Sequence, residues 1–323
     1  FDLRGVALLG KVEEIGRRIM DKCDNLQFIL VPTDLKEAYA EELAWHYREH
    51  ITDHVCTIDG ISYSIDTQSH CATVISLLHH TTPSYTTLNN PTPHNTTLYN
   101  PIQPYTILPH YHGHVIIPEH IEYNGQTYEV KKIANYAFFG SHIEEIDLPE
   151  GLAQIGQYAF GWCDELREIV LPSSVRTVGK GGCFSCDKLR FAKMSESMFD
   201  VPDDMFAGCD QLLTVILSNN TLWIGQSAFE ECANLRAIYL PASLHRIEDS
   251  AFRRCGSLRE VRLPDGMKKL DMNIFEGCDG LEKLIIGPNI QQYVPMEDPE
   301  DDEYPHLIVP EHMRDTYQQM GMK

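Results

Sequence analysis

Apolar residues recur along the second half of the chain at a fixed interval of 23 positions. Four columns of side chains keep this interval: Cys163, Cys186, Cys209, Cys232, Cys255 and Cys278; Leu166, Leu189, Leu212, Leu235, Leu258 and Leu281; Ile155, Val178, Val201, Ile224, Ile247 and Leu270; and Phe160, Phe206, Phe229, Phe252 and Phe275. The phenylalanine column has one gap, where Cys183 replaces the ring. A shorter copy of 22 residues, which includes Ala137 and Pro149, precedes the others. Six copies in register indicate an internal repeat.

Each repeat contains one short strand. In the copy from Ala159 to Pro172, Ile169 and Leu171 alternate with outward positions as on a β-strand, and Pro172 ends the strand because it lacks a backbone donor. A single unit of 23 residues cannot bury its apolar side alone, whereas stacked units share one continuous core. The pattern therefore predicts a solenoid whose strands line up as a parallel sheet on one face.

The repeat resembles a known family. Ile155-Gly156, Ala159-Phe160 and Cys163 follow the pattern of the BspA-type leucine-rich repeat, and the match is dense over residues 133–290. The resemblance implies an α/β-type leucine-rich-repeat solenoid, mostly short parallel strands with turns and short helical segments. Arrays of this family typically sit in secreted or cell-surface proteins of anaerobic bacteria and some parasitic protists. The resemblance therefore implies a non-catalytic protein-binding or adhesion module, with no enzymatic activity and no cofactor.

Both ends of the chain look like the end of a repeat array. Residues 10–32 align without a gap on residues 150–172, and Asp34 and Glu37 have the spacing of a helix-capping box. Val309-Pro310 with Tyr317 repeats the arrangement of Val31-Pro32 with Tyr39. We therefore expect residues 1–53 to be the last repeat and helical cap of a first array, and residues 291–323 to be an acidic loop and the cap of a second.

The segment between these arrays is predicted to be rich in β-structure. Residues 58–63 and 116–128 have strand patterns, and Asn124-Gly125 is typical of a tight hairpin turn. Residues 79–109 are rich in Thr, Pro, Asn and His, which indicates an extended or partly disordered insertion. We interpret residues 54–132 as an N-terminal cap that carries this insertion, and residues 133–290 as the array itself.

Composition narrows the possible partners. With 323 residues and 43% apolar content the chain can bury a sizeable core. Its formal charge of −21 opposes binding to nucleic acid, and no apolar run is long enough for a membrane span. The chain begins at Phe1, so we expect either that a leader has been removed or that the chain is a piece of a longer protein.

The cysteines have several possible roles. The cysteine column could be a metal ladder, a disulfide staple or a set of buried free thiols. Buried free thiols are favoured because the column occupies a core position in each repeat. Cys183 and Cys186 form a CxxC pair, but Cys183 occupies the phenylalanine column, which argues against redox chemistry. Cys56 and Cys71 are candidates for a disulfide if the protein is exported.

Two further segments raise the question of metal binding. His110, His112 and His114 alternate as zinc ligands on a strand would, and residues 297–303 form an acidic run that suits calcium. A histidine-rich surface loop and a solvated connector are the favoured interpretations, so we expect no metal site. No GxSxG, HExxH, P-loop or dinucleotide-binding glycine pattern occurs. A metal-dependent enzyme that uses the histidine-rich insertion, or a structural spacer, is the alternative to a binding module.

The alternation of the strands predicts where a partner binds. Two outward columns follow from the interval of 23, one running from Glu168 to Lys283 and the other from Val170 to Ile285. The second is unexpectedly apolar and has Tyr and Arg near its middle, a composition typical of interface hot spots. A protein or other macromolecular surface ligand is the expected partner, and the candidate contact residues are Val170, Phe191, Lys193, Ile216, Tyr239, Arg262 and Ile285.

Overall fold

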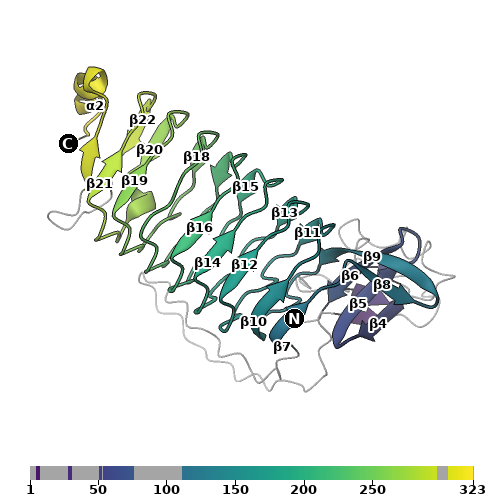
Figure 1. Cartoon of the computed structure of the whole chain (residues 1–323). Helices are drawn as coiled ribbons and strands as arrows, with labels where there is room; N and C mark the ends of the chain where they lie inside the picture. Colours follow the sequence, from purple (N-terminus) through teal and green to yellow (C-terminus); the bar gives the residue numbers. More distant parts are fainter. Residues whose placement is uncertain are drawn as a thin grey trace, which may run out of the picture.

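The repeats stack into a solenoid, whose coils follow one another along a single axis (Figure 1). The computed structural model describes residues 5–7, 28–30, 51–52, 54–75, 111–296 and 305–322. Within residues 111–296 most coils contribute one strand to each of two rows and a pair of turns between them. The solenoid of short parallel strands predicted from the sequence is confirmed.

The first row contains the strands that the sequence predicts. These are β7 (His112–Ile116), β10 (His142–Asp147), β12 (Glu168–Val170), β14 (Phe191–Lys193), β16 (Thr214–Ile216), β19 (Glu260–Arg262), β21 (Lys283–Ile285) and β23 (His306–Ile308). The paired strands are parallel, and from β12 onward the paired residues are 23 positions apart, as Ile169, Ala192 and Val215 are. Residues 237–239 continue the row through a bridge from Ala237 to Glu260. We call the outward side of this row the main face.

A second row of strands runs along another side of the solenoid and was not predicted. Its members are β9 (Gln126–Ile133), β11 (Gln154–Ile155), β13 (Thr177–Val178), β15 (Asp200–Val201), β17 (Trp223–Ile224), β18 (Arg246–Ile247), β20 (Lys269–Asp271) and β22 (Gln292–Val294). The coils approach so closely here that a Cβ on Gly179 would lie 2.3 Å from the backbone nitrogen of Gln157. This contact explains the glycine of the Val178-Gly179 pair, the counterpart of Ile155-Gly156.

Turns, and not helices, connect the two rows in most coils. Ala159-Phe160 lies between Tyr158 and Trp162, whose φ angles of 49° and 60° are left-handed, and the same pair of turns recurs in the following coils. The expected short helical segments are few in the described part of the chain. They are the 3-10 helices η3 (Met272–Phe275) and η4 (Glu311–Met313) and the α-helix α2 (Arg314–Gln319).

The phenylalanine column forms a stack inside the solenoid. Phe229 lies between Phe206 and Phe252, with ring centroids 5.6 and 5.3 Å away and nearly parallel planes. The stack breaks at Cys183. There the preceding residue is Gly182, and a Cβ on it would lie 2.9 Å from the Met205 sulfur, which shows that a flexible methionine fills space next to the gap.

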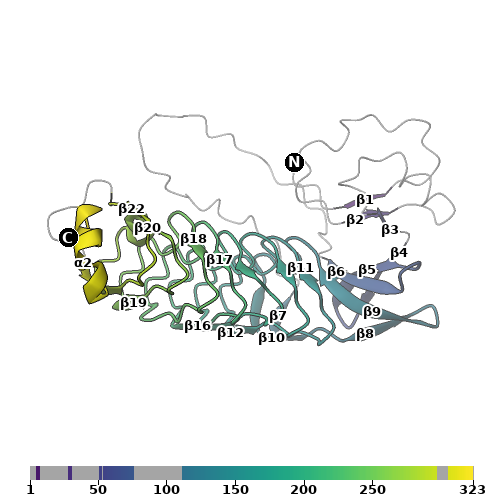
Figure 2. The ribbon, with the colours of Figure 1, turned by 90° about the horizontal axis from the view of Figure 1, so that it is seen from above.

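Strand pairing extends the second row at the N-terminal end. β4 (His54–Ile58), β5 (Ile61–Asp66) and β6 (Cys71–Ile75) are antiparallel, and β6 pairs in parallel with β9 (Figure 2). β8 (His120–Tyr123) pairs with β9 around Asn124-Gly125, so the predicted hairpin is confirmed. A second hairpin turns at Asp59-Gly60. The Tyr111 hydroxyl donates to the carbonyl of Ile75 at 3.2 Å and ties these strands to the first coil.

The C-terminal end is closed by Tyr317. Its ring is buried, and its hydroxyl donates to the carbonyl of Gly287 at 2.7 Å and accepts from the amide of Ile290 at 3.2 Å. Near the start of the chain, β1 (Gly5–Ala7), β2 (Phe28–Leu30) and β3 (Ile51–Thr52) form a separate parallel sheet. The division of the chain at residues 53, 132 and 290 stays a prediction, and the insertion at 79–109 lies outside the described residues.

Candidate functional site

The main face brings together all seven residues predicted to contact a partner. Val170, Phe191, Lys193, Ile216, Tyr239, Arg262 and Ile285 occupy adjacent rungs of the first row. Tyr239 is 76% exposed, and Val170 and Ile216 are 46% and 44% exposed. Their neighbours Ile169 and Leu171 are buried, so the predicted alternation is present. That these side chains bind a partner stays a prediction.

The apolar column is longer than the sequence analysis proposed. Ile116 on β7 is 60% exposed and Ile308 on β23 is 44% exposed, and both lie in the column of Val170 and Ile285. Ile308 follows Ile285 by 23 residues, so the repeat interval alone could have found it. The repeat interval could not have found Ile116, because β7 and β10 pair through a bulge and their paired residues are not 23 positions apart.

A column of arginines borders the main face and was also missed. Arg167, Arg190, Arg236 and Arg259 recur one position before the strands, with Leu213 in the remaining coil. All five side chains are exposed. The same interval of 23 carries this signal, but the residues lie just outside the strand pattern on which the prediction was based.

The cysteine column is structural. Each thiol is buried and free, and each donates a hydrogen bond to the carbonyl 25 or 26 residues earlier, as Cys232 does to Phe206 at 3.2 Å. Burial raises the pKa of the Cys183, Cys186 and Cys232 thiols, which keeps them protonated. The CxxC pair therefore lacks the reactive thiolate of a redox site, and the interpretation as buried free thiols is confirmed for the column.

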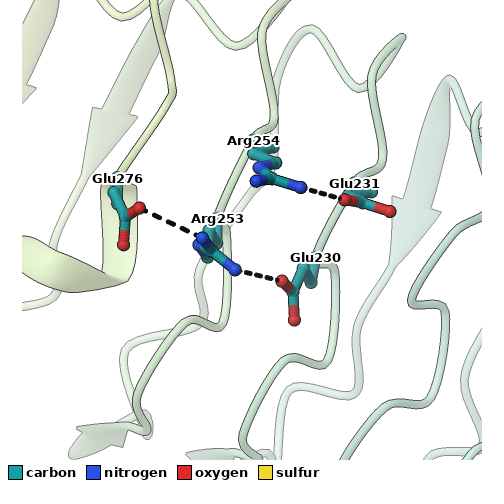
Figure 3. Close-up of polar contacts among 5 residues, drawn as sticks. All are labelled: Glu230, Glu231, Arg253, Arg254 and Glu276. Carbon is teal, nitrogen blue, oxygen red and sulfur yellow. Dashed lines mark hydrogen bonds and ion pairs between the residues drawn. The ribbon is translucent and has the colours of Figure 1, made fainter. Parts of the chain in front are cut away.

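Ion pairs connect neighbouring coils on the turn side. The Arg253 guanidinium bonds Glu230 of the preceding coil at 3.0 Å and Glu276 of the following coil at 3.2 Å, and Arg254 bonds Glu231 at 2.6 Å (Figure 3). The five side chains form a ladder with alternating charge along the solenoid axis. Each of its three carboxylates is paired with one of its two arginines, so the ladder connects three successive coils in register.

A column of aspartates on the turns carries the most perturbed carboxyl. Burial, and then the charge of Asp187 in the next coil, raises the pKa of Asp164 to about 6. Burial also raises the pKa of Asp187 and of Asp210. These groups repeat with the coils, so the raised pKa of Asp164 reflects a cost of stacking like charges.

The possible metal and disulfide sites do not assemble in the described part of the chain. There, no three His, Cys, Asp or Glu side chains lie close enough to hold a metal ion. His114 bonds the carboxylate of Asp147 at 2.9 Å, whereas His110 and the acidic run at 297–303 lie outside the described residues. Cys56 on β4 and Cys71 on β6 are both free, with β5 between their strands.

The described helices have no membrane-spanning character. None of them has the length and apolar composition that a bilayer crossing requires.

Comparison with known proteins identifies the repeat. The model of the BspA type leucine rich repeat region matches six copies, over residues 120–236 and 222–295. No curated protein matches the chain. A leucine-rich repeat protein from Eubacterium ventriosum ATCC 27560 is 18% identical with a TM-score of 0.51, over 93% of this chain and 61% of that one.

Two other solved structures resemble the chain more loosely. A leucine rich cell surface protein from Faecalibacterium prausnitzii A2-165 is 18% identical with a TM-score of 0.45, over 75% of this chain and 73% of that one. A leucine rich repeat protein of T. pallidum is 20% identical with a TM-score of 0.44, over 84% and 97%. The Eubacterium structure supports the solenoid fold. Since the family model covers more than half of the residues, the chain belongs to the BspA-type leucine-rich repeat family.

Proposed function

We propose that this protein is a non-catalytic binding module that attaches to a macromolecular partner through the main face of its solenoid. The proposal includes a secreted or cell-surface location, which is what the family implies. The observation that carries it is the exposure of Tyr239 on the main face, where the ring lies in the same column as Arg262 and Ile216.

The composition of this column supports an interface. Exposed apolar side chains are ordinary when they are scattered, but five of them in one column, interrupted by Asp147, Lys193 and Arg262, favour a binding site. Tyr239 and Arg262 are the residue types that most often dominate binding energy, and they lie on adjacent strands near the middle of the row. Nine rungs separated by ~4.8 Å give a strip roughly 40 Å long, sufficient for a protein partner.

The test compares two double variants of the same chemistry. Tyr239→Ala with Arg262→Ala removes an aromatic ring and a guanidinium from adjacent strands of the main face. Trp223→Ala with Arg246→Ala removes the same groups from adjacent strands of the second row, where Trp223 pairs with Arg246. Attachment of beads coated with each protein to epithelial and bacterial cell layers is measured, together with circular dichroism to verify folding.

We expect the main-face variant to lose attachment by at least about 10-fold, since a hot spot contributes about 2 kcal/mol or more. The second-row variant should attach like the original protein. Equal attachment of all three proteins would remove the main face as the binding site. A protein that attaches to no surface would instead favour the structural spacer.

A further inference from the structure

The charge on the main face differs in sign from the charge of the whole protein. The four rungs from β14 to β19 present five exposed basic side chains, Arg190, Lys193, Arg236, Arg259 and Arg262. The same rungs present one carboxylate, that of Glu260. The chain as a whole has a formal charge of −21. The centre of the main face is therefore a cationic strip on an acidic molecule.

The cations of this strip are left available, while many elsewhere are neutralised. Arg167 pairs with Glu144 at 2.7 Å, Lys188 with Glu165 at 2.6 Å and the turn-side arginines with their glutamates. Among the described residues, the ion pairs include none with Arg190, Lys193, Arg236 or Arg262. Arg259 is 3.9 Å from Glu282, a long and exposed contact.

Apolar side chains alternate with these cations. Leu213 and Ile216 are 43% and 44% exposed, Tyr239 is 76% exposed, and the Phe191 ring is partly exposed between Arg190 and Lys193. A partner that supplies only negative charge would leave this apolar surface in water. Sulfated polysaccharides are of that kind, and a uniformly anionic chain longer than the strip would also meet the exposed Glu145 and Asp147 on β10.

We propose that the cationic strip binds an extended protein segment in which carboxylates alternate with aromatic or aliphatic side chains. This inference rests on the proposed function and names the partner's chemistry. Carboxylates reach the guanidinium groups, while apolar side chains cover Leu213, Ile216 and Tyr239. At physiological salt the screening length is about 8 Å, so the local cations outweigh the distant carboxylates of the chain.

The geometry limits the length of the segment. Three intervals of ~4.8 Å between the four rungs span ~14 Å, which an extended chain covers with about four or five residues. Beyond β12, the rung on β10 exposes Glu145 and Asp147, with Glu144 at its edge. These carboxylates repel an acidic residue, so the segment's acidic part ends before β10.

The test uses fluorescent ten-residue peptides and the full chain. In one peptide aspartate alternates with phenylalanine and leucine; in the second lysine replaces aspartate; in the third serine replaces the apolar residues. Fluorescence anisotropy gives the Kd of each peptide at 50 and 150 mM NaCl, and a heparin oligosaccharide serves as the polyanion without apolar groups. We expect the first peptide to bind at least 10-fold more tightly than the other two and than heparin, and to weaken as salt rises.

Charge reversal locates the binding. Lys193→Glu with Arg236→Glu should raise the Kd of the aspartate peptide at least 10-fold and lower the Kd of the lysine peptide. Arg176→Glu with Lys268→Glu makes the same change of charge at exposed positions just before β13 and β20, and should alter the Kd by less than 2-fold.

Other outcomes overturn the inference. These are equal weakening by both double variants, tighter binding of heparin or of the serine peptide, and no binding of the aspartate peptide. If cell attachment still depends on Tyr239 and Arg262 in any of these cases, the main face keeps its proposed role and only the acidic partner is rejected.

Discussion

Truncation of Phe229 to alanine tests the register of the core. The side chain is fully buried and lies between two parallel rings, those of Phe206 and Phe252. Loss of a buried phenylalanine costs about 3–5 kcal/mol through lost burial and the cavity that remains. Each aromatic pair adds about 0.5–1.5 kcal/mol beyond burial, and two pairs are lost here, so we expect a value near the upper end of that range.

Phe160 provides the matched control. It is equally buried, but it stacks only on Phe138, at 5.3 Å, because Cys183 follows it in the column. Phe160→Ala should therefore cost about 1 kcal/mol less than Phe229→Ala, the value of one aromatic pair. Phe229→Leu keeps most of the volume and should cost less than either truncation.

Guanidinium unfolding followed by circular dichroism measures how much each of the three variants lowers the free energy of unfolding. Since solenoids can unfold in segments, the transition is also followed through the fluorescence of Trp162 and Trp223. A change below about 1 kcal/mol for Phe229→Ala, or a cost for Phe160→Ala that exceeds it, would refute the idea that the rings form a continuous stack interrupted at Cys183.

Three further changes test the contacts between coils. Cys232→Ala removes the thiol donor to the carbonyl of Phe206, which keeps its bond from the amide of Cys209, and should destabilise the protein by about 0.5–1.5 kcal/mol. A thiol reagent should modify the native cysteine column slowly and the unfolded column quickly. Gly179→Ala places a Cβ against the backbone of Gln157 and should cost about 1–3 kcal/mol in thermal unfolding; an unchanged melting temperature would contradict the close approach. The pKa of Asp164 is about 6 in the folded protein, against an ordinary value of 3.8. Between these pH values the folded state binds more protons than the unfolded state, so the contribution of Asp164 to stability falls as the pH rises from about 4 to 6. Asp164→Asn should raise stability at pH 7 and flatten that part of the pH profile, and a loss of stability at pH 7 would show that the carboxylate is favourably paired.

The first row of strands was predictable because it depends on three successive residues. Ile169 between Glu168 and Val170 shows the alternation of a strand, and the interval of 23 places its partners. The second row escaped because most of its strands have only two or three residues, too few for alternation to be visible. Thr177 and Val178 are identified as a strand only by their pairing with β11.

The turns and the pairing of the N-terminal strands could not be predicted from the sequence, for other reasons. Tyr158 and Trp162 adopt left-handed backbone angles although neither is Gly or Asn, so their residue types give no local signal. The pairing of β6 with β9 joins segments more than 50 residues apart, and local patterns carry no information about such a contact. The seven candidate residues could be assigned to the main face because they follow the strand alternation, and their contact with a partner stays a prediction. The arginine column was missed because it precedes the strands.

The hydrogen bonds of the cysteine column repeat with a translation of one coil. Each thiol donates to a carbonyl of the preceding coil, and the strand pairs and ion pairs of this region lie within one coil or connect adjacent coils. The array can therefore gain or lose a whole 23-residue unit. After duplication or deletion of one unit in the gene, the coils on both sides would meet through equivalent positions. Such an event would lengthen or shorten the molecule by ~4.8 Å while leaving every remaining junction unchanged, so unequal recombination can adjust the reach of the molecule without a new core having to evolve.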